Sequence, residues 1–191
     1  MRMQFFGDSY DVVKRFLLRT VAPNAKWTAF PMFTHEVAAA DISAFEAFLG
    51  VSVASPRVIT SSTDRATHLL ALADHLHIFL DPDIGIKLKP SKGADAVKYV
   101  FGPELVALCK QNRDRLLLVF DQSVPRGAER KAKAIAEKLS YFRERELCGF
   151  AYLSHACFLV LSCSELACHT ARNLLLASHL PKTRLVDAND A

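Results

Sequence analysis

The sequence lacks the short motifs that identify several large enzyme classes. It contains no G-x-x-x-x-G-K-[ST] loop, no G-x-G-x-x-G turn, no H-E-x-x-H helix and no G-x-S-x-G elbow. These absences disfavour a nucleotide-triphosphate motor, a standard dinucleotide enzyme and an α/β-hydrolase with the usual nucleophile turn. Internal repeats, low-complexity tracts and interdomain linkers are missing too, so the sequence predicts one domain over residues 1–191.

Long apolar runs and paired cysteines are also missing. No run approaches the roughly 20 apolar residues that a membrane span needs, and charge falls too early for a secretory signal. The five cysteines form no C-x-x-C pair, and an odd number suits reduced thiols. Cys163-x4-Cys168-His169 has metal-binding residue types, but its spacing is unusual and its pattern is helical. The sequence therefore predicts a cytoplasmic protein with no membrane partner.

Charge is only weakly biased, with a net +4 over the chain. Much of the positive charge lies in RGAERKAKAIAEKLSYFRERE, residues 126–146, which also contains four glutamates. This segment is typical of a solvated helix face, and a phosphate-contacting face is the alternative. No sustained basic run argues for nucleic acid by itself.

Apolar strands alternate with helical segments along the chain. HIFL (77–80) and RLLLVF (115–120) are predicted buried strands, and FAYLS and CFLVLS follow as an adjacent, antiparallel pair. KWTAFPMF reads as a strand broken at Pro31, and PRVIT as a further short strand. The pattern predicts an α/β fold: a three-layer, Rossmann-like, mostly parallel sheet with a mixed edge.

Polar side chains follow three of the predicted strands. In parallel sheets, ligands bind outside the carboxyl ends of the strands, and neighbouring strands there would bring Asp81 and Asp121 close together. Gathered carboxylates are costly unless a cation, a proton or a basic substrate lies between them. Helix capping and local turns are the structural alternative. The predicted catalytic residues are Asp81, Asp83, Asp121 and His155, with Ser123 and Ser154 nearby.

Two segments resemble a known family. G-D-S-Y-D-V-V-K-R, residues 7–15, is similar to the G-N-F-x-D-V-x-K-H helix opening of methyltransferases that modify adenine in large-subunit ribosomal RNA. LDPD, residues 80–83, resembles the D-P-P-[YF] motif that ends the fourth strand of amino-methyltransferases. The chain also looks like a group of bacterial proteins sharing G-D-x-Y-D-x-x-K, P-M-[FL]-T, D-P-D-x-G and F-D-Q-S.

The resemblance implies a methyltransferase-like fold whose antiparallel edge is the last strand pair. It implies cofactor-binding roles for Asp8, Asp11 and Lys14, and contact between Asp81 and a target amino group. S-adenosylmethionine is the cofactor implied. Two departures weaken that implication: Asp83 replaces the second proline of the motif without a following aromatic residue, and the turn after the first strand, P-M-F-T-H-E, contains no glycine.

Three functions remain open from the sequence. The first is an enzyme that modifies nucleic acid or a nucleotide from a methyltransferase-like scaffold. The second is a magnesium- or manganese-dependent phosphodiester or phosphate hydrolase with Asp81 and Asp121 as metal ligands. The third is a non-catalytic binding or assembly protein with a degenerate methyltransferase-like fold. A homodimer is an ordinary expectation for any of them.

Overall fold

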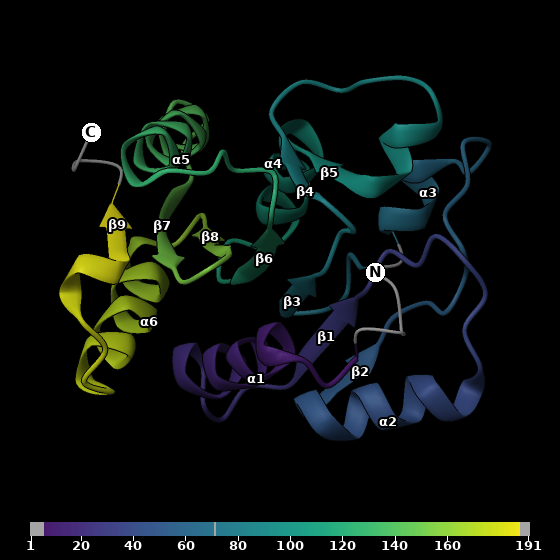
Figure 1. Cartoon of the computed structure of the whole chain (residues 1–191), viewed down its shortest axis with the longest axis horizontal. Helices are drawn as coiled ribbons and strands as arrows, with labels where there is room; N and C mark the ends of the chain where they lie inside the picture. The colour runs from purple at the N-terminus through teal and green to yellow at the C-terminus, as the bar shows by residue number, and fades with distance from the viewer. Residues whose placement is uncertain (1–5, 71, 188–191) are drawn as a thin grey trace.

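A seven-stranded mixed sheet forms the centre of the protein (Figure 1). The structure, a computed structural model, describes residues 6–70 and 72–187. The strand order is β2-β1-β3-β6-β8-β7-β9, and the first four strands pair in parallel. These four strands are β2 (Val51–Val53), β1 (Trp27–Phe30), β3 (His77–Leu80) and β6 (Leu117–Asp121). The α/β class is confirmed.

The other side of the sheet is antiparallel. β8 (Cys157–Ser162) pairs in antiparallel fashion with both β6 and β7 (Cys148–Leu153), so it lies between them. β9 (Leu185–Asp187) closes the edge beside β7, after a short 3-10 turn, η3 (Lys182–Arg184). The predicted antiparallel strand pair is therefore present, and β8 is inserted next to the parallel strands.

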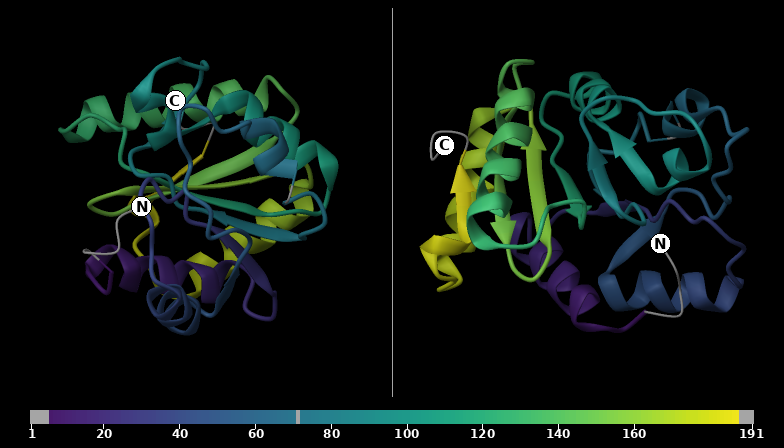
Figure 2. Two further views of the ribbon diagram at one scale, coloured as in Figure 1. Left: turned by 90° about the vertical axis from the view of Figure 1, so that its right-hand side faces the viewer. Right: turned by 45° about the horizontal axis from the view of Figure 1, so that its top comes forward.

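Helices cover both faces of this sheet (Figure 2, left). Two buried apolar clusters, one on each face, hold these helices against the strands. On one face lie α1 (Ser9–Val21), α2 (Ala39–Leu49) and α6 (Glu165–Ala177). On the other face lie α3 (Arg65–Leu70), α4 (Gly102–Gln111) and α5 (Ala128–Arg143). No helix in the described residues is long and apolar enough to cross a bilayer.

A small excursion separates β3 from α4. It contains β4 (Gly85–Lys87), the 3-10 turn η2 (Ala94–Lys98) and β5 (Tyr99–Phe101), and its two strands pair in parallel. β4 is held against the chain that leaves β6, because the backbone N–H of Gln122 donates to the carbonyl of Ile84 at 2.8 Å. The excursion therefore lies beside the carboxyl end of β6.

One predicted strand is wrong. PRVIT (56–60) is not a strand, and the edge strand β2 lies a few residues earlier, directly after Gly50. Gly50 ends α2 in the left-handed conformation (φ 74°) that glycine adopts at little cost. Since β2 begins at the next residue, Pro56 falls in the connection that leads towards α3.

Candidate functional site

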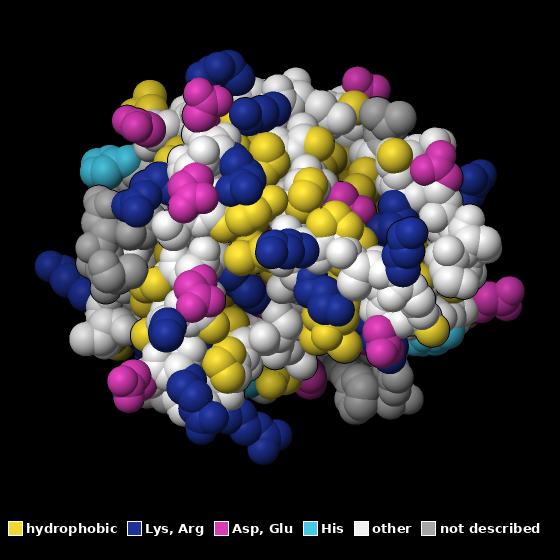
Figure 3. All heavy atoms as spheres, turned by 90° about the horizontal axis from the view of Figure 1, so that it is seen from above, with side chains coloured by type: hydrophobic (Ala, Val, Ile, Leu, Met, Phe, Trp, Pro, Cys, Tyr) yellow, Lys and Arg dark blue, Asp and Glu magenta, His cyan; other side chains and the backbone are white. Residues whose placement is uncertain are grey.

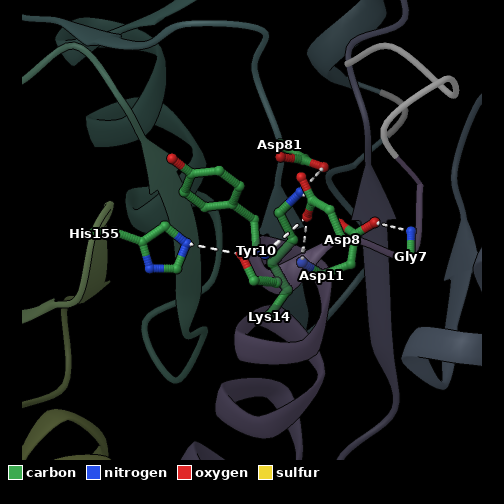
Figure 4. A network of polar contacts seen from close by, with 8 residues as sticks. Gly7, Asp8, Tyr10, Asp11, Lys14, Asp81 and His155 are labelled. Atoms are coloured by element: carbon green, nitrogen blue, oxygen red, sulfur yellow. Dashed lines mark hydrogen bonds and ion pairs between the residues drawn. The ribbon is translucent and has the colours of Figure 1, made fainter.

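The first turn of α1 lies at the carboxyl edge of the parallel strands (Figure 4). Asp8 caps the helix: its Oδ1 accepts hydrogen bonds from the backbone N–H groups of Tyr10 at 2.8 Å and Asp11 at 3.2 Å. Asp11 accepts from the backbone N–H of Gly7 at 2.8 Å, one residue before the cap. The G-D-S-Y-D sequence thus satisfies the free N–H groups at the start of this helix.

Lys14 lies between two carboxylates. Its Nζ is 2.9 Å from Oδ1 of Asp11 and 2.9 Å from Oδ2 of Asp81. All three side chains are buried, and Lys14 also lies 4.5 Å from the centroid of the Phe120 ring. The structure therefore brings together three predicted site residues, as a buried triad that contains two carboxylates and one ammonium.

The surroundings of the triad shift its pKa values. Burial lowers the pKa of Lys14, but the carboxylates of Asp81 and Asp11 more than compensate, so its pKa lies above the ordinary value. Burial raises the pKa of Asp81, although Lys14 opposes the shift. The two neighbouring carboxylates account for the raised pKa of Lys14, and burial accounts for the raised pKa of Asp81. The triad therefore keeps its lysine charged and contains two acids for one base.

Asp121 belongs to a second buried cluster. Its Oδ2 pairs with Nζ of Lys138 from α5 at 2.5 Å. Its Oδ1 accepts from the backbone N–H groups of Ile86 and Ser123 and from the Ser123 hydroxyl. Asp121 therefore joins β6, α5 and the β4–β5 excursion, and its oxygens are occupied by these contacts.

The expected approach of Asp81 to Asp121 is wrong. Leu80 pairs with Val119 in the β3–β6 register, so Asp121 is one position further along its strand than Asp81. Successive strand residues point to opposite faces, which places Asp81 on the α1 face and Asp121 on the α5 face. Their contacts with Lys14 of α1 and Lys138 of α5 agree with this assignment.

This geometry removes the arrangement on which the expected magnesium or manganese site depended. Asp81 and Asp121 each pair with a lysine on opposite sides of the sheet. Across residues 6–70 and 72–187, no three His, Cys, Asp or Glu side chains are grouped so that they could hold a metal ion. That statement includes Cys163, Cys168 and His169.

The remaining predicted residues lie at turns. Asp83 is half-buried in the connection between β3 and β4. His155 is exposed in the β7–β8 turn, where its ring contacts Tyr10 with 4.1 Å between ring centroids. Nε2 of His155 lies 3.4 Å from the hydroxyl of Ser9 (Figure 4). His155 thus lies next to the α1 turn that carries the triad, although it is distant in sequence.

A hollow of about 380 Å³ opens beside His155 and Tyr10. The other walls come from the loop between β6 and α5 and from the first turn of α5. Nζ of Lys131 donates to the carbonyl of Ser154 at 3.0 Å, which ties that turn to the β7–β8 turn. No carboxylate lines the hollow. Its lining residues are Tyr10, Gln122, Val124, Pro125, Arg126, Gly127, Lys131 and His155.

Sequence reasoning identified only His155 among these lining residues. Arg126 and Lys131 fall in the basic segment, but the sequence does not say which of its charges face a hollow. Tyr10 lies within the G-D-S-Y-D motif, where the neighbouring acids carry the recognisable chemistry and the tyrosine gives no signal of its own. For the triad, the Asp11-to-Lys14 spacing of three residues was the available signal, since residues three apart meet on a helix.

The turn after β1 is filled by its own side chains. Met32 and Phe33 are 2% and 0% exposed, and Met32 has a left-handed backbone (φ 51°). In the implied methyltransferase site, glycines at this turn would let the cofactor approach the backbone. The bulky residues found here do not fit S-adenosylmethionine in that position.

Comparisons of the chain with known proteins give no relative from which a role could be transferred. No protein-family model, no curated protein and no solved structure matches the chain.

Proposed function

We propose that the protein binds a nucleotide unit, free or within a nucleic acid, in the hollow between α1, α5 and the β7–β8 turn. The observation that carries the proposal is the combination of Arg126 and Lys131 with the Tyr10–His155 ring pair, in a hollow without carboxylates. Cationic side chains suit phosphate groups, and aromatic rings suit the faces of bases.

Each wall has a chemical role in this proposal. Arg126 is exposed and offers a planar fork of donors to phosphate oxygens. Lys131 is held in place by the Ser154 carbonyl and adds a second positive charge. α5 begins here at Gly127 without a side-chain cap, so free N–H groups of its first turn also favour an anion.

The scaffold in this proposal is methyltransferase-like and three-layered. The insertion of antiparallel β8 beside four parallel strands supports it, as does the position of the hollow at the carboxyl ends of the strands. Because Met32 and Phe33 fill the turn after β1, no reaction step through S-adenosylmethionine is proposed. A binding role on a degenerate scaffold therefore has more support than methyl transfer.

A catalytic role, the second candidate, would depend on His155. It is the one predicted acid-base residue that lines the hollow and is exposed. Neutral imidazole accepts a proton and imidazolium donates one, both near neutral pH. Asp81, by contrast, is 1% exposed and paired with Lys14, so a bound molecule cannot reach it without movement of α1.

Calorimetric titration with nucleoside mono- and diphosphates tests the binding proposal. We expect saturable binding that Arg126→Gln weakens about tenfold, as loss of one charged phosphate contact implies. Tyr10→Phe keeps the ring and should bind like the parent, whereas Tyr10→Leu should bind more weakly. The control is Arg113→Gln, which removes an exposed arginine just before β6, at the opposite edge of the sheet. Failure of the parent to bind any of these ligands at millimolar concentration would overturn the proposal.

A further inference from the structure

The β4–β5 excursion and the start of α5 carry an unusual share of the positive charge. Residues 84–101 contain four lysines and one aspartate, and residues 122–133 contain four basic residues and one glutamate. Each segment therefore has a net charge of +3, and together they exceed the net +4 of the whole chain. The rest of the chain is slightly acidic.

These two segments lie side by side. The backbone N–H of Gln122 donates to the carbonyl of Ile84, and the hydroxyl oxygen of Ser123 lies 3.0 Å from the carbonyl oxygen of Ile86. Gln122 also lines the hollow, so β4 begins against a wall of the proposed nucleotide site. The two positively charged segments thus adjoin where β4 begins, beside one wall of the hollow.

Several lysines of the excursion have fixed positions, and others are free to meet solvent. Nζ of Lys87 lies 4.5 Å from the Tyr99 ring centroid and donates to Ser91, while Lys98 pairs with Asp95. Lys89 and Lys92 are exposed in the connection after β4. Figure 3 views the side of the protein that carries α5 and the excursion, and basic side chains lie across its middle beside apolar ones.

We infer that the excursion, residues 84–101, is an arm that binds the phosphate backbone of a polynucleotide. One nucleotide of that polynucleotide occupies the hollow, and the arm binds phosphates outside it. The inference rests on the proposed function and narrows its ligand from nucleotides in general to a nucleic acid strand. Positive charge on an adjoining segment outside the hollow would make no contact with a free mononucleotide. Further phosphates of a polynucleotide would supply partners for it. Lys89 and Lys92 make the outer contacts, and Arg126 and Lys131 make the inner ones.

Fluorescence anisotropy with labelled single strands of about a dozen nucleotides tests the arm, since single-strand sites commonly span 4–16 nucleotides. The test variant is Lys89→Gln/Lys92→Gln. The matched control is Lys26→Gln/Arg113→Gln, which also removes two exposed charges, but at the amino edge of the sheet just before β1 and β6. Both variants leave the hollow and the buried ion pairs intact.

The expected result is about tenfold weaker binding of the strand by the arm variant at about 0.1 M salt, with the control like the parent. The slope of log affinity against log salt should fall by about 1.4, since each phosphate contact contributes about 0.7 for single strands. Binding of a mononucleotide should be unchanged in the arm variant.

Three results would overturn the inference. If the arm variant binds the strand like the parent while Arg126→Gln weakens both strand and mononucleotide, the arm is wrong and the proposed function stands. If the parent binds neither ligand, the proposed function fails and the inference fails with it. If the parent binds vesicles of anionic phospholipid but no strand, the charged surface serves a membrane instead.

Discussion

A Cβ atom placed on Gly85 would lie 2.0 Å from Oδ1 of Asp121. Gly85 also has φ 140°, a conformation that residues with side chains rarely adopt. Gly85 of D-P-D-I-G and Asp121 of F-D-Q-S are therefore in close contact, and the contact leaves no room for a side chain at position 85. This contact fixes the β4–β5 excursion to the end of β6, and it accounts for the glycine and for Asp121 without a ligand.

Gly85→Ala should destabilise the protein by about 3–5 kcal/mol, because backbone strain and a steric clash with a buried carboxylate add together. The matched control is Gly93→Ala, which has φ 96° and open space around its Cβ, and should lose only about 1 kcal/mol. Urea unfolding midpoints measure both changes. Equal losses in the two variants would show that the Asp121 contact is unimportant.

Lys14→Met should lower the free energy of unfolding by about 3–5 kcal/mol at neutral pH, because it leaves two buried carboxylates without a cation. Asp81→Asn should cost less than about 1.5 kcal/mol, since the amide oxygen still accepts from Lys14 and Asp11 alone balances its charge. Chemical denaturation of both variants checks the difference. If Asp81→Asn lowers the free energy of unfolding as much as Lys14→Met does, the triad does not contain an acid that it can spare.

The contribution of Lys14 to the free energy of unfolding should decrease at alkaline pH. The pKa of Lys14 is raised in the folded protein, so its contribution is complete below its ordinary pKa of 10.5 and is lost as pH rises through the higher folded value. The difference in unfolding free energy between the parent and Lys14→Met should therefore shrink at the alkaline end of a pH series. A difference that stays constant to the alkaline limit of folding would contradict the shift.

Three of the five thiols should react in a defined order. The hydrogen bond with Cys168 lowers the pKa of Cys148, which is partly exposed, whereas burial raises the pKa of Cys157 and Cys109 well above the ordinary value. Alkylation of the native protein near neutral pH, followed by peptide mass mapping, should label Cys148 first. Cys109 and Cys157 should be labelled only after unfolding, and early labelling of either would contradict their burial.

Much of the fold could be predicted from the periodicity of apolar residues. The predicted strand HIFL is β3, with three of its four residues buried, and the predicted RLLLVF overlaps the fully buried β6 (Leu117–Asp121). The helix opening in G-D-S-Y-D-V-V-K-R is α1, which begins after Asp8. β2 was missed because three residues are too few to show a period. PRVIT was misassigned because its short run of β-branched residues looks like a strand in isolation.

The site was less predictable because its geometry depends on strand register. Both acids follow buried strands, but a register offset of one residue decides whether Asp81 and Asp121 meet or lie on opposite faces. This one-residue offset between β3 and β6 cannot be read from one sequence, because it depends on how the two strands pair. The hollow could not be predicted for a related reason. The sequence singles out His155, but Tyr10 and Arg126 show no signal in it, and the three residues line one hollow only because three distant turns meet.

The insertion of β8 between β6 and β7 has a consequence for biosynthesis. β6 has no partner on that side until residues 157–162 have left the ribosome, although β7 is made earlier. A nascent chain or truncated fragment that stops before Cys157 would expose the apolar edge of β6, and such edges recruit other chains. We therefore expect fragments ending before β8 to aggregate, and fragments that include it to stay dispersed.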